Sequence, residues 1–94
     1  MSYEFSDRAK SDIDVIFDYG EQQFGYVAAT DYIVELFKLC ELIVAHPEMG
    51  RVADVGPPGT RQTVHRSHSV YYTIEPDIIY VHRILGTQDI GSAF

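Results

Sequence analysis

The chain has 94 residues, a net charge of −7 and a single cysteine. These values predict one domain spanning 1–94, exclude an internal disulfide, and argue against broad binding to nucleic acid, in which phosphate neutralisation dominates affinity. The N-terminus lacks the basic and apolar regions of a secretory signal, and Glu35, Lys38 and Glu41 interrupt the longest apolar segment. We therefore expect a soluble cytoplasmic protein with no membrane span.

The charge is distributed unevenly. Residues 1–50 hold ten of the fourteen acidic residues and three of the seven basic ones, whereas residues 51–94 hold four of each. Three of the four histidines, His65, His68 and His82, lie in the second half. This pattern predicts an acidic first half and a neutral to weakly basic second half, on which a small positive face remains possible.

The first part of the chain predicts a strand followed by a helix. Residues 2–5 alternate as a short strand does, and Ser6 or Asp7 is placed to cap the helix that follows. Apolar residues then recur at intervals of three and four over 9–24, which is typical of one helical stripe, and Gly25 breaks the pattern.

A second helix is predicted from about 26 to 45, because Pro47 follows it closely. So few residues separate the two helices that they should form an antiparallel hairpin. Cys40 falls on the apolar face and is interpreted as a small buried side chain. The apolar face of this helix is wider than one packing partner requires, owing to Tyr32, Leu39 and Leu42.

The second half predicts a loop and then a sheet. Gly and Pro residues mark 47–60 as an ordered loop. Three runs rich in β-branched and aromatic residues follow at about 61–66, 69–75 and 78–85, with the turn pair Pro76-Asp77 between the last two. The fold predicted is α+β, in the order β-α-α-β-β-β, with a helical hairpin packed on a mostly antiparallel four-stranded sheet. The last residues, 86–94, are expected to be a loosely anchored tail.

Motifs along nearly the whole chain resemble the ParE toxins of the RelE/ParE toxin–antitoxin superfamily. Together, in order and at family spacing, they are more specific than any is alone. They are Ala9 with Asp12-Ile13 and Ile16, Tyr19, Phe24-Gly25, Tyr32 with Leu36, His46-Pro47-Glu48-Met49-Gly50-Arg51, Gly59-Thr60-Arg61, His68-Ser69-Val70-Tyr71-Tyr72, and Asp77-Ile78-Ile79 leading to Arg83-Ile84-Leu85. The sequence departs from the family at Gly86, where a histidine commonly follows the Arg-Ile-Leu motif.

The resemblance implies the same fold and a toxin that is neutralised by a cognate ParD-like antitoxin in a hetero-oligomer. It also implies inhibition of DNA gyrase by binding, with no catalytic residue and no cofactor. The antitoxin is expected on the hairpin at Tyr32, Leu36 and Leu39, where the wide apolar face leaves room for a partner. The surface for the target or the antitoxin is expected around Arg61, His68, Tyr72 and Arg83.

Two other functions remain open. A RelE-like mRNA endoribonuclease needs a proton-transfer pair and cations for the phosphate. Arginines and histidines of the second half are candidates for these roles, but the chain has no lysine after Lys38, no Tyr or His in 86–94, and an unfavourable net charge. The other alternative is a diverged, non-toxic module that retains only antitoxin binding.

Purely structural roles for the same side chains also remain open. No cysteine or dense carboxylate group joins the histidines, so a metal site is not predicted, and His65 and His68 would lie on opposite faces of a continuous strand. Arg61 and Arg83 are equally suited to a structural pair with a carboxylate such as Asp77 or Asp89. Tyr71 and Tyr72 should alternate, one in the core and one at the surface.

The register of the last strand stays open because two alternating sets of residues are both apolar. One set is Ile78, Tyr80 and Ile84, and the other is Ile79, Val81 and Leu85.

Overall fold

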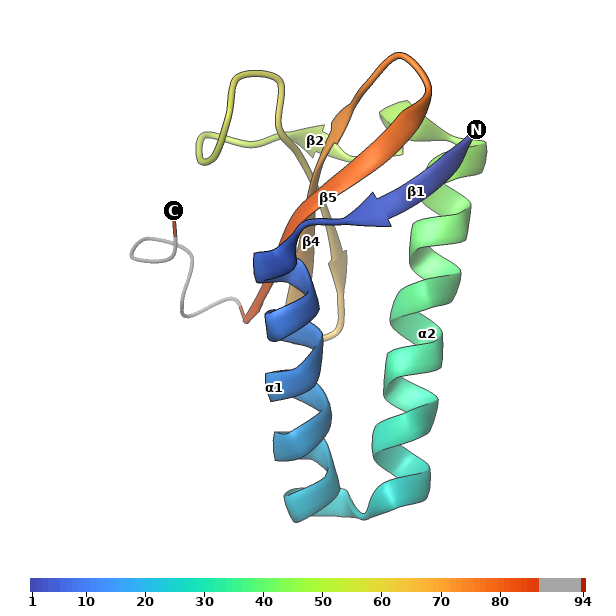
Figure 1. Ribbon diagram of the computed structural model, residues 1–94, viewed down its shortest axis with the longest axis vertical. Coiled ribbons are helices and arrows are strands. Elements are labelled where there is room, and N and C mark those ends of the chain that lie inside the picture. The colour runs from blue at the N-terminus through green and yellow to red at the C-terminus, as the bar shows by residue number, and fades with distance from the viewer. Residues whose placement is uncertain (87–93) are drawn as a thin grey trace.

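The computed structural model describes residues 1–86 and Phe94 (Figure 1). Two antiparallel helices lie against one face of a single sheet, so the predicted α+β fold and its helical hairpin are confirmed. The elements in chain order are β1 (Ser2–Phe5), α1 (Asp7–Phe24), α2 (Tyr26–Ala45), the short 3-10 helix η1 (Pro47–Met49), β2 (Arg51–Val52), β3 (Arg61–His65), β4 (His68–Ile74) and β5 (Ile78–Gly86). No helix in this part of the chain is long and apolar enough to cross a membrane. The expected tail, 86–94, lies outside the described residues except for Gly86, which belongs to β5, and Phe94.

The sheet has five strands in the order β1-β5-β4-β3-β2, one more than the sequence predicts. The additional strand is β2, whose two residues pair with Gln62 and Arg61 at the start of β3. It lies within the predicted loop 47–60, where so short a strand leaves no alternating pattern. β1 runs parallel to β5, and the other pairs are antiparallel, so the sheet is mostly antiparallel as expected.

The predicted helix ends are confirmed. The Ser6 hydroxyl accepts a hydrogen bond from the Ala9 N–H at 3.0 Å, which caps α1, and donates to the His82 carbonyl at 2.7 Å. The cap therefore also fastens the start of α1 to β5. Gly25 has a φ of 91°, a left-handed value that glycine adopts without strain, and this residue alone joins the two helices.

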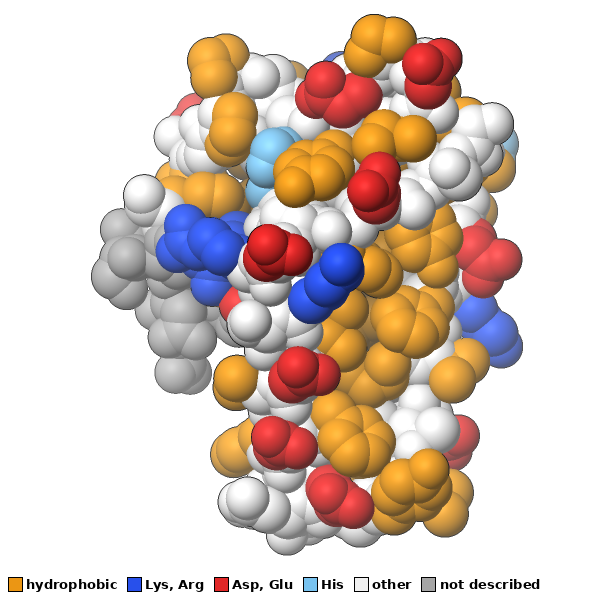
Figure 2. Space-filling model, viewed as in Figure 1, with side chains coloured by type: hydrophobic (Ala, Val, Ile, Leu, Met, Phe, Trp, Pro, Cys, Tyr) orange, Lys and Arg blue, Asp and Glu red, His pale blue; other side chains and the backbone are white. Residues whose placement is uncertain are grey.

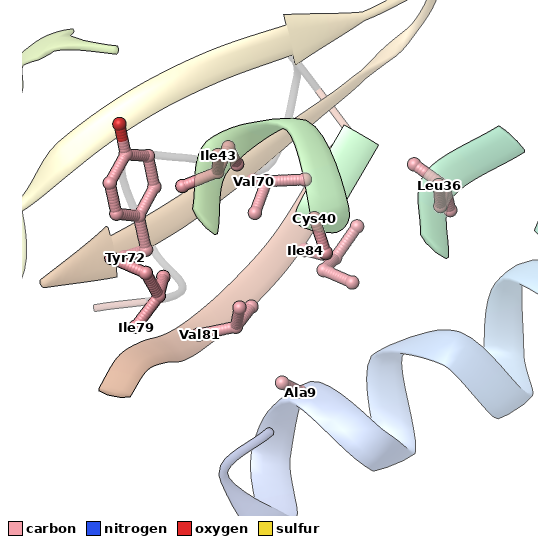
Figure 3. Close-up of a cluster of buried hydrophobic side chains, with 9 residues drawn as sticks. All are labelled: Ala9, Leu36, Cys40, Ile43, Val70, Tyr72, Ile79, Val81 and Ile84. Atoms are coloured by element: carbon pink, nitrogen blue, oxygen red, sulfur yellow. The ribbon is translucent and has the colours of Figure 1, made fainter. Parts of the chain in front are cut away.

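The hydrophobic core lies between the hairpin and the sheet (Figure 3). Its buried side chains come from both helices and from β4 and β5, and they are Ala9, Leu36, Cys40, Ile43, Val70, Tyr72, Ile79, Val81 and Ile84. The predicted buried position of Cys40 is confirmed, and burial raises the pKa of its thiol to about 12.

A β-bulge in β5 decides its register. Tyr71 pairs with Arg83 and Tyr72 with Val81, which leaves His82 as an extra residue between them. The bulge changes which alternate residues face the helices, so the core receives Ile79 and Val81 before it and Ile84 after it. Neither of the two regularly alternating sets describes the strand.

The expectation that one of Tyr71 and Tyr72 lies at the surface is wrong, because both side chains are fully buried. They do point to opposite faces of the sheet. Tyr72 enters the core beneath the helices, whereas the ring of Tyr71 on the other face packs edge-on against Phe94, with 5.2 Å between the ring centroids.

Candidate functional site

The helical hairpin is longer than the sheet it covers. Both helices continue past the turn between β3 and β4, so their distal ends have no strand beneath them (Figure 1). A groove of about 420 Å³ opens where this overhang meets the turn. Its lining consists of Ile16, Tyr19, Gly20, Phe24, Ala28, Ala29, Asp31, Tyr32, Glu35, Arg66, Ser67 and His68.

The floor of the groove is apolar and open to solvent. Tyr19 and Phe24 are 63% and 74% exposed, although both are large aromatic side chains. Gly20 and Ala29 are in close contact, since a Cβ atom added to Gly20 would lie 3.4 Å from that of Ala29. These small residues lower the floor between the two helices, so a partner backbone can approach closely. An exposed apolar groove of this kind is typical of a protein interaction site.

One end of the groove is closed by polar contacts between α2 and the β3–β4 turn. The Tyr32 hydroxyl lies 2.6 Å from Nδ1 of His68, and burial raises the pKa of this tyrosine. Glu35 lies 2.8 Å from Nε2 of His65 and 3.2 Å from Nε of Arg66. The hydrogen bond with His65 is the main reason that the pKa of Glu35 is lowered. We call this closed end the rim of the groove. It is held in place by side chains from two distant parts of the sequence, α2 and the β3–β4 turn.

The two histidines of this rim are not arranged as a continuous strand would arrange them. The chain reverses at Arg66, whose φ is 53°, and Ser67, so His65 and His68 face each other across a hairpin. Both rings contact the ring of Tyr32. Within residues 1–86 and Phe94, no group of three His, Cys, Asp or Glu side chains is arranged to hold a metal ion.

Arg83 occupies a structural position away from this groove. Its Nε and Nη2 atoms each lie 2.8 Å from an oxygen of Asp12, and its side chain is only 12% exposed. The hydrogen bonds to Asp12 are the main reason that the pKa of Arg83 is raised. Among the described residues, the carboxylate that pairs with Arg83 is therefore Asp12 of α1 and not Asp77, and Asp89 lies outside these residues.

The side chains of Arg61 and Tyr72 both form hydrogen bonds with the segment from Pro47 to Gly50. They pair across β3 and β4, and both reach the chain between Pro47 and Gly50. The Tyr72 hydroxyl donates to the Pro47 carbonyl at 2.7 Å and accepts from the Gly50 N–H at 3.0 Å. Arg61 donates to the Gly50 carbonyl at 2.6 Å. The fit is tight, since a Cβ atom at Gly50 would lie 2.5 Å from the Tyr72 hydroxyl.

The structure thus separates the residues that the sequence singled out. Tyr32 and His68 meet at the groove, and Arg61 and Tyr72 hold the segment after α2. Leu36 is fully buried and Leu39 is partly buried against the core, so neither forms the open floor of the groove. The sequence analysis named Tyr19 and Phe24 as motif positions but gave them no role in a site. It did not single out the other groove residues Ala28, Asp31, Glu35 and Arg66 as site residues. The available signal was the family motif, since Tyr19 and Phe24 are among the positions that carry the resemblance.

Comparison with known proteins assigns the fold to a family. A family model described as the ParE toxin of the type II toxin–antitoxin system parDE matches residues 3–91. The chain belongs to this family. It is 40% identical over 72 residues to Toxin ParE1 of Caulobacter vibrioides, which covers 77% of this chain and 75% of the relative. A solved structure of the chromosomal ParDE system from P. aeruginosa matches with a TM-score of 0.79 and 26% identity, covering 92% of this chain and 95% of that chain.

These matches confirm the resemblance found in the sequence motifs. ParE toxins of ParDE systems pair with an antitoxin. The chain is therefore a ParE toxin by family.

Proposed function

We propose that this ParE-family toxin inhibits DNA gyrase by binding, and that a cognate antitoxin neutralises it by placing a segment in the hairpin groove. The groove itself carries the second part of the proposal. The helices leave aromatic side chains such as Tyr19 and Phe24 uncovered where the sheet ends, and a partner that buries them gains about 25 cal/mol for each Å² of apolar surface. Tyr32, predicted for this role, lies at the edge of the groove.

The arrangement of the basic side chains supports binding over catalysis. A nuclease needs cations and a proton-transfer group converging on one phosphate. In this chain Arg61 contacts the segment after α2, Arg66 contacts Glu35, and Arg83 contacts Asp12. His65 and His68 do lie together at the groove, but their rings contact Glu35 and Tyr32. The His82 ring lies elsewhere, 2.8 Å from the Thr73 hydroxyl on the sheet face away from the helices. These contacts favour a toxin that acts through a protein surface.

For the target we propose the segment that Arg61 and Tyr72 hold in place. Met49 within this segment is 42% accessible, and the two residues of β2 that follow it, Arg51 and Val52, are also exposed, with Val52 69% accessible. Rigid presentation of apolar side chains lowers the ordering cost of binding. In this proposal Arg61 and Tyr72 position the target surface without touching the target.

The toxin's action is tested by inducing this chain alone in bacteria while DNA replication and mRNA integrity are followed in one culture. Gyrase inhibition predicts filamentation and a DNA-damage response with intact mRNA. Rapid mRNA cleavage with translation arrest would instead establish a RelE-like endoribonuclease. Normal growth with folded protein would leave only the diverged antitoxin-binding module.

The antitoxin site is tested by coexpressing the cognate antitoxin with this toxin. Ala28→Gln places a long uncharged side chain in the groove and should abolish the rescue of growth. Val34→Gln is the matched control, because Val34 is an exposed residue of α2 that does not line the groove. Equal rescue of both variants would place the antitoxin elsewhere on the toxin.

A further inference from the structure

We infer that the target of this toxin enters a second groove, at the C-terminal end of α2, with an apolar side chain that lies beside a lysine or arginine. This inference rests on the proposed function, because it specifies the chemistry of the target segment that meets the surface held by Arg61 and Tyr72. It follows from the shape of this groove, from the rigidity of one of its walls, and from the charges around it.

The second groove lies at the end of the molecule opposite the link between the two helices. The end of α2, η1 and the β4–β5 turn come together there (Figure 1). A groove of about 490 Å³ opens at this end, and we call it the end groove. Its lining consists of Ala45, His46, Pro47, Glu48, Met49 and Ile74. It shares no lining residue with the hairpin groove, so the two grooves are separate surfaces.

The end groove exposes large apolar side chains. Met49 of η1 and Ile74 at the end of β4 are 42% and 41% exposed. A partner side chain that covers them removes apolar surface from water on both sides of the contact. The unbranched side chain of Met49 can also adapt to the shape of what it covers. The lining therefore suits an apolar side chain of the target.

The wall formed by η1 is rigid. Tyr72 and Arg61 hold the segment between Pro47 and Gly50 through hydrogen bonds to its backbone. The space beneath Gly50 is already filled, since a Cβ atom there would lie 2.8 Å from the Thr63 hydroxyl. A wall that is fixed before binding has little order left to gain, so the cost of association is lower.

The charges at the end groove are negative. The last carbonyl groups of a helix have no partners within the helix and form its negative pole. The last turn of α2 contains no basic residue to offset this pole. Glu48 adds an exposed carboxylate to the lining, and it forms no ion pair with any residue in the described part of the chain. Acidic and apolar side chains also adjoin at this end of the molecule on the face shown in Figure 2.

The neighbouring arginines are directed elsewhere. Arg61 donates to the carbonyl groups of Gly50 at 2.6 Å and of Glu48 at 3.4 Å. Arg51 pairs with Gln62, which pairs in turn with Tyr71, so these side chains share the sheet face away from the helices. A lysine or arginine of the target therefore meets a negative site at the groove. A second copy of the toxin would bring two such sites together, and the phosphates of nucleic acid would be repelled as well.

Inhibition of purified gyrase tests the apolar part of the site. Ile74→Gln should raise the toxin concentration needed for half-maximal inhibition of supercoiling about tenfold, because it removes apolar surface that the target buries. Val64→Gln is the matched control, since Val64 is a β-branched strand residue that is 52% exposed and does not line the groove. Thermal denaturation checks that the variants fold, and Met49→Gln gives the same test from η1 if Ile74→Gln does not fold.

Substitution of Glu48 tests the charge. Glu48→Lys should weaken inhibition about tenfold, since it replaces an attraction by a repulsion. Asp54→Lys is the matched control, because it makes the same change in net charge on an exposed residue between β2 and β3 that does not line the groove. Equal effects of these two substitutions would overturn the charge selection. Equal inhibition by Ile74→Gln and Val64→Gln would overturn the groove as the target site.

Photo-crosslinking reads the chemistry of the occupant directly. Met49 is replaced by the photoreactive residue p-benzoylphenylalanine, and the gyrase peptide that becomes crosslinked is identified by mass spectrometry. The inference predicts a peptide in which an apolar residue lies beside a lysine or arginine. A crosslinked peptide without a basic residue would overturn it.

The same variants separate this inference from the proposed function. Gyrase that is inhibited equally by all of them would overturn the end groove and leave the proposed target in place. Gyrase that is insensitive to the wild-type toxin would overturn the proposed target, and growth arrest of bacteria by the same variants would then decide the role of the groove by itself. A wild-type toxin that arrests no growth would overturn both.

Discussion

Asp12 and Arg83 are 71 residues apart in the sequence and meet through two N–O contacts of 2.8 Å each. The same carboxylate accepts the backbone N–H of Ile84 at 3.0 Å. β1 pairs with β5 only as far as Val81, so the edge of β5 would be open beyond that point. Asp12, from α1, accepts a hydrogen bond at this open part of β5 and thereby fastens the helical hairpin to β5.

Asp12→Ala should therefore lower the free energy of unfolding by about 2–4 kcal/mol, because it leaves the guanidinium of Arg83 largely buried without its carboxylate. Asp14→Ala is the control, since Asp14 is an exposed residue of the same helix, and it should change stability by about 0.5 kcal/mol or less. Urea denaturation followed by circular dichroism measures both. Similar losses for the two variants would show that the pair contributes little to stability.

Tyr72→Phe should cost about 1–3 kcal/mol, because the Pro47 carbonyl and the Gly50 N–H lose their side-chain partner. Tyr80→Phe makes the same chemical change on a half-buried residue for which the structure gives no hydroxyl hydrogen bond, and it should be nearly neutral. Hydrogen exchange at the Gly50 amide gives a local readout. An unchanged exchange rate in Tyr72→Phe would contradict the proposed role of Tyr72 in holding this segment.

Local patterns were sufficient to predict most of the fold. The helices follow from a stripe of 3.6-residue period, the cap from Ser6, and the link from Gly25, all of which act within a few residues. The bulge at His82 could not be predicted, because it depends on how β4 and β5 fit together and both alternating sets of β5 are apolar. The two residues of β2 were missed for a similar reason, since they become a strand only by pairing with β3.

The candidate site was harder to predict because it depends on where the helices and strands end relative to one another in three dimensions. Tyr32 and His68 meet only because β3 and β4 turn back beneath α2, and the partner of Arg83 lies on another element. The buried positions of Leu36 and Tyr72 were also not visible in the sequence, since each helix or strand presents more apolar residues than one face can bury. The motifs identified the family, but they did not distinguish residues that touch a partner from residues that position the surface.

The thiol of Cys40 should be inert in the folded protein. It is fully buried, and burial raises its pKa to about 12, so very little thiolate is present near neutral pH. A disulfide-forming thiol reagent should react at the rate of unfolding in native buffer and rapidly in denaturant. Fast reaction in native buffer would show that α2 opens from the sheet far more often than its packing suggests.

His82 should give the folded protein a sensitivity to mild acid. Burial lowers the pKa of its imidazole, and nearby Glu75 only partly opposes this effect. The unfolded chain therefore takes up a proton first as the pH falls below the ordinary histidine value of 6.5. The contribution of His82 to stability is present above that pH and is lost as the pH falls towards the folded-state pKa.

His82→Asn removes this titration, so the free energy of unfolding should fall less between pH 7 and pH 5.5 in the variant than in the wild-type protein. His46→Asn is the control, because His46 is exposed at the end of α2. Denaturant titrations at several pH values measure the difference. Glu35, whose pKa is lowered, loses its contribution only below about pH 4.5, outside this window. Parallel curves for wild type and His82→Asn would mean that protonated His82 is accommodated without cost next to Thr73.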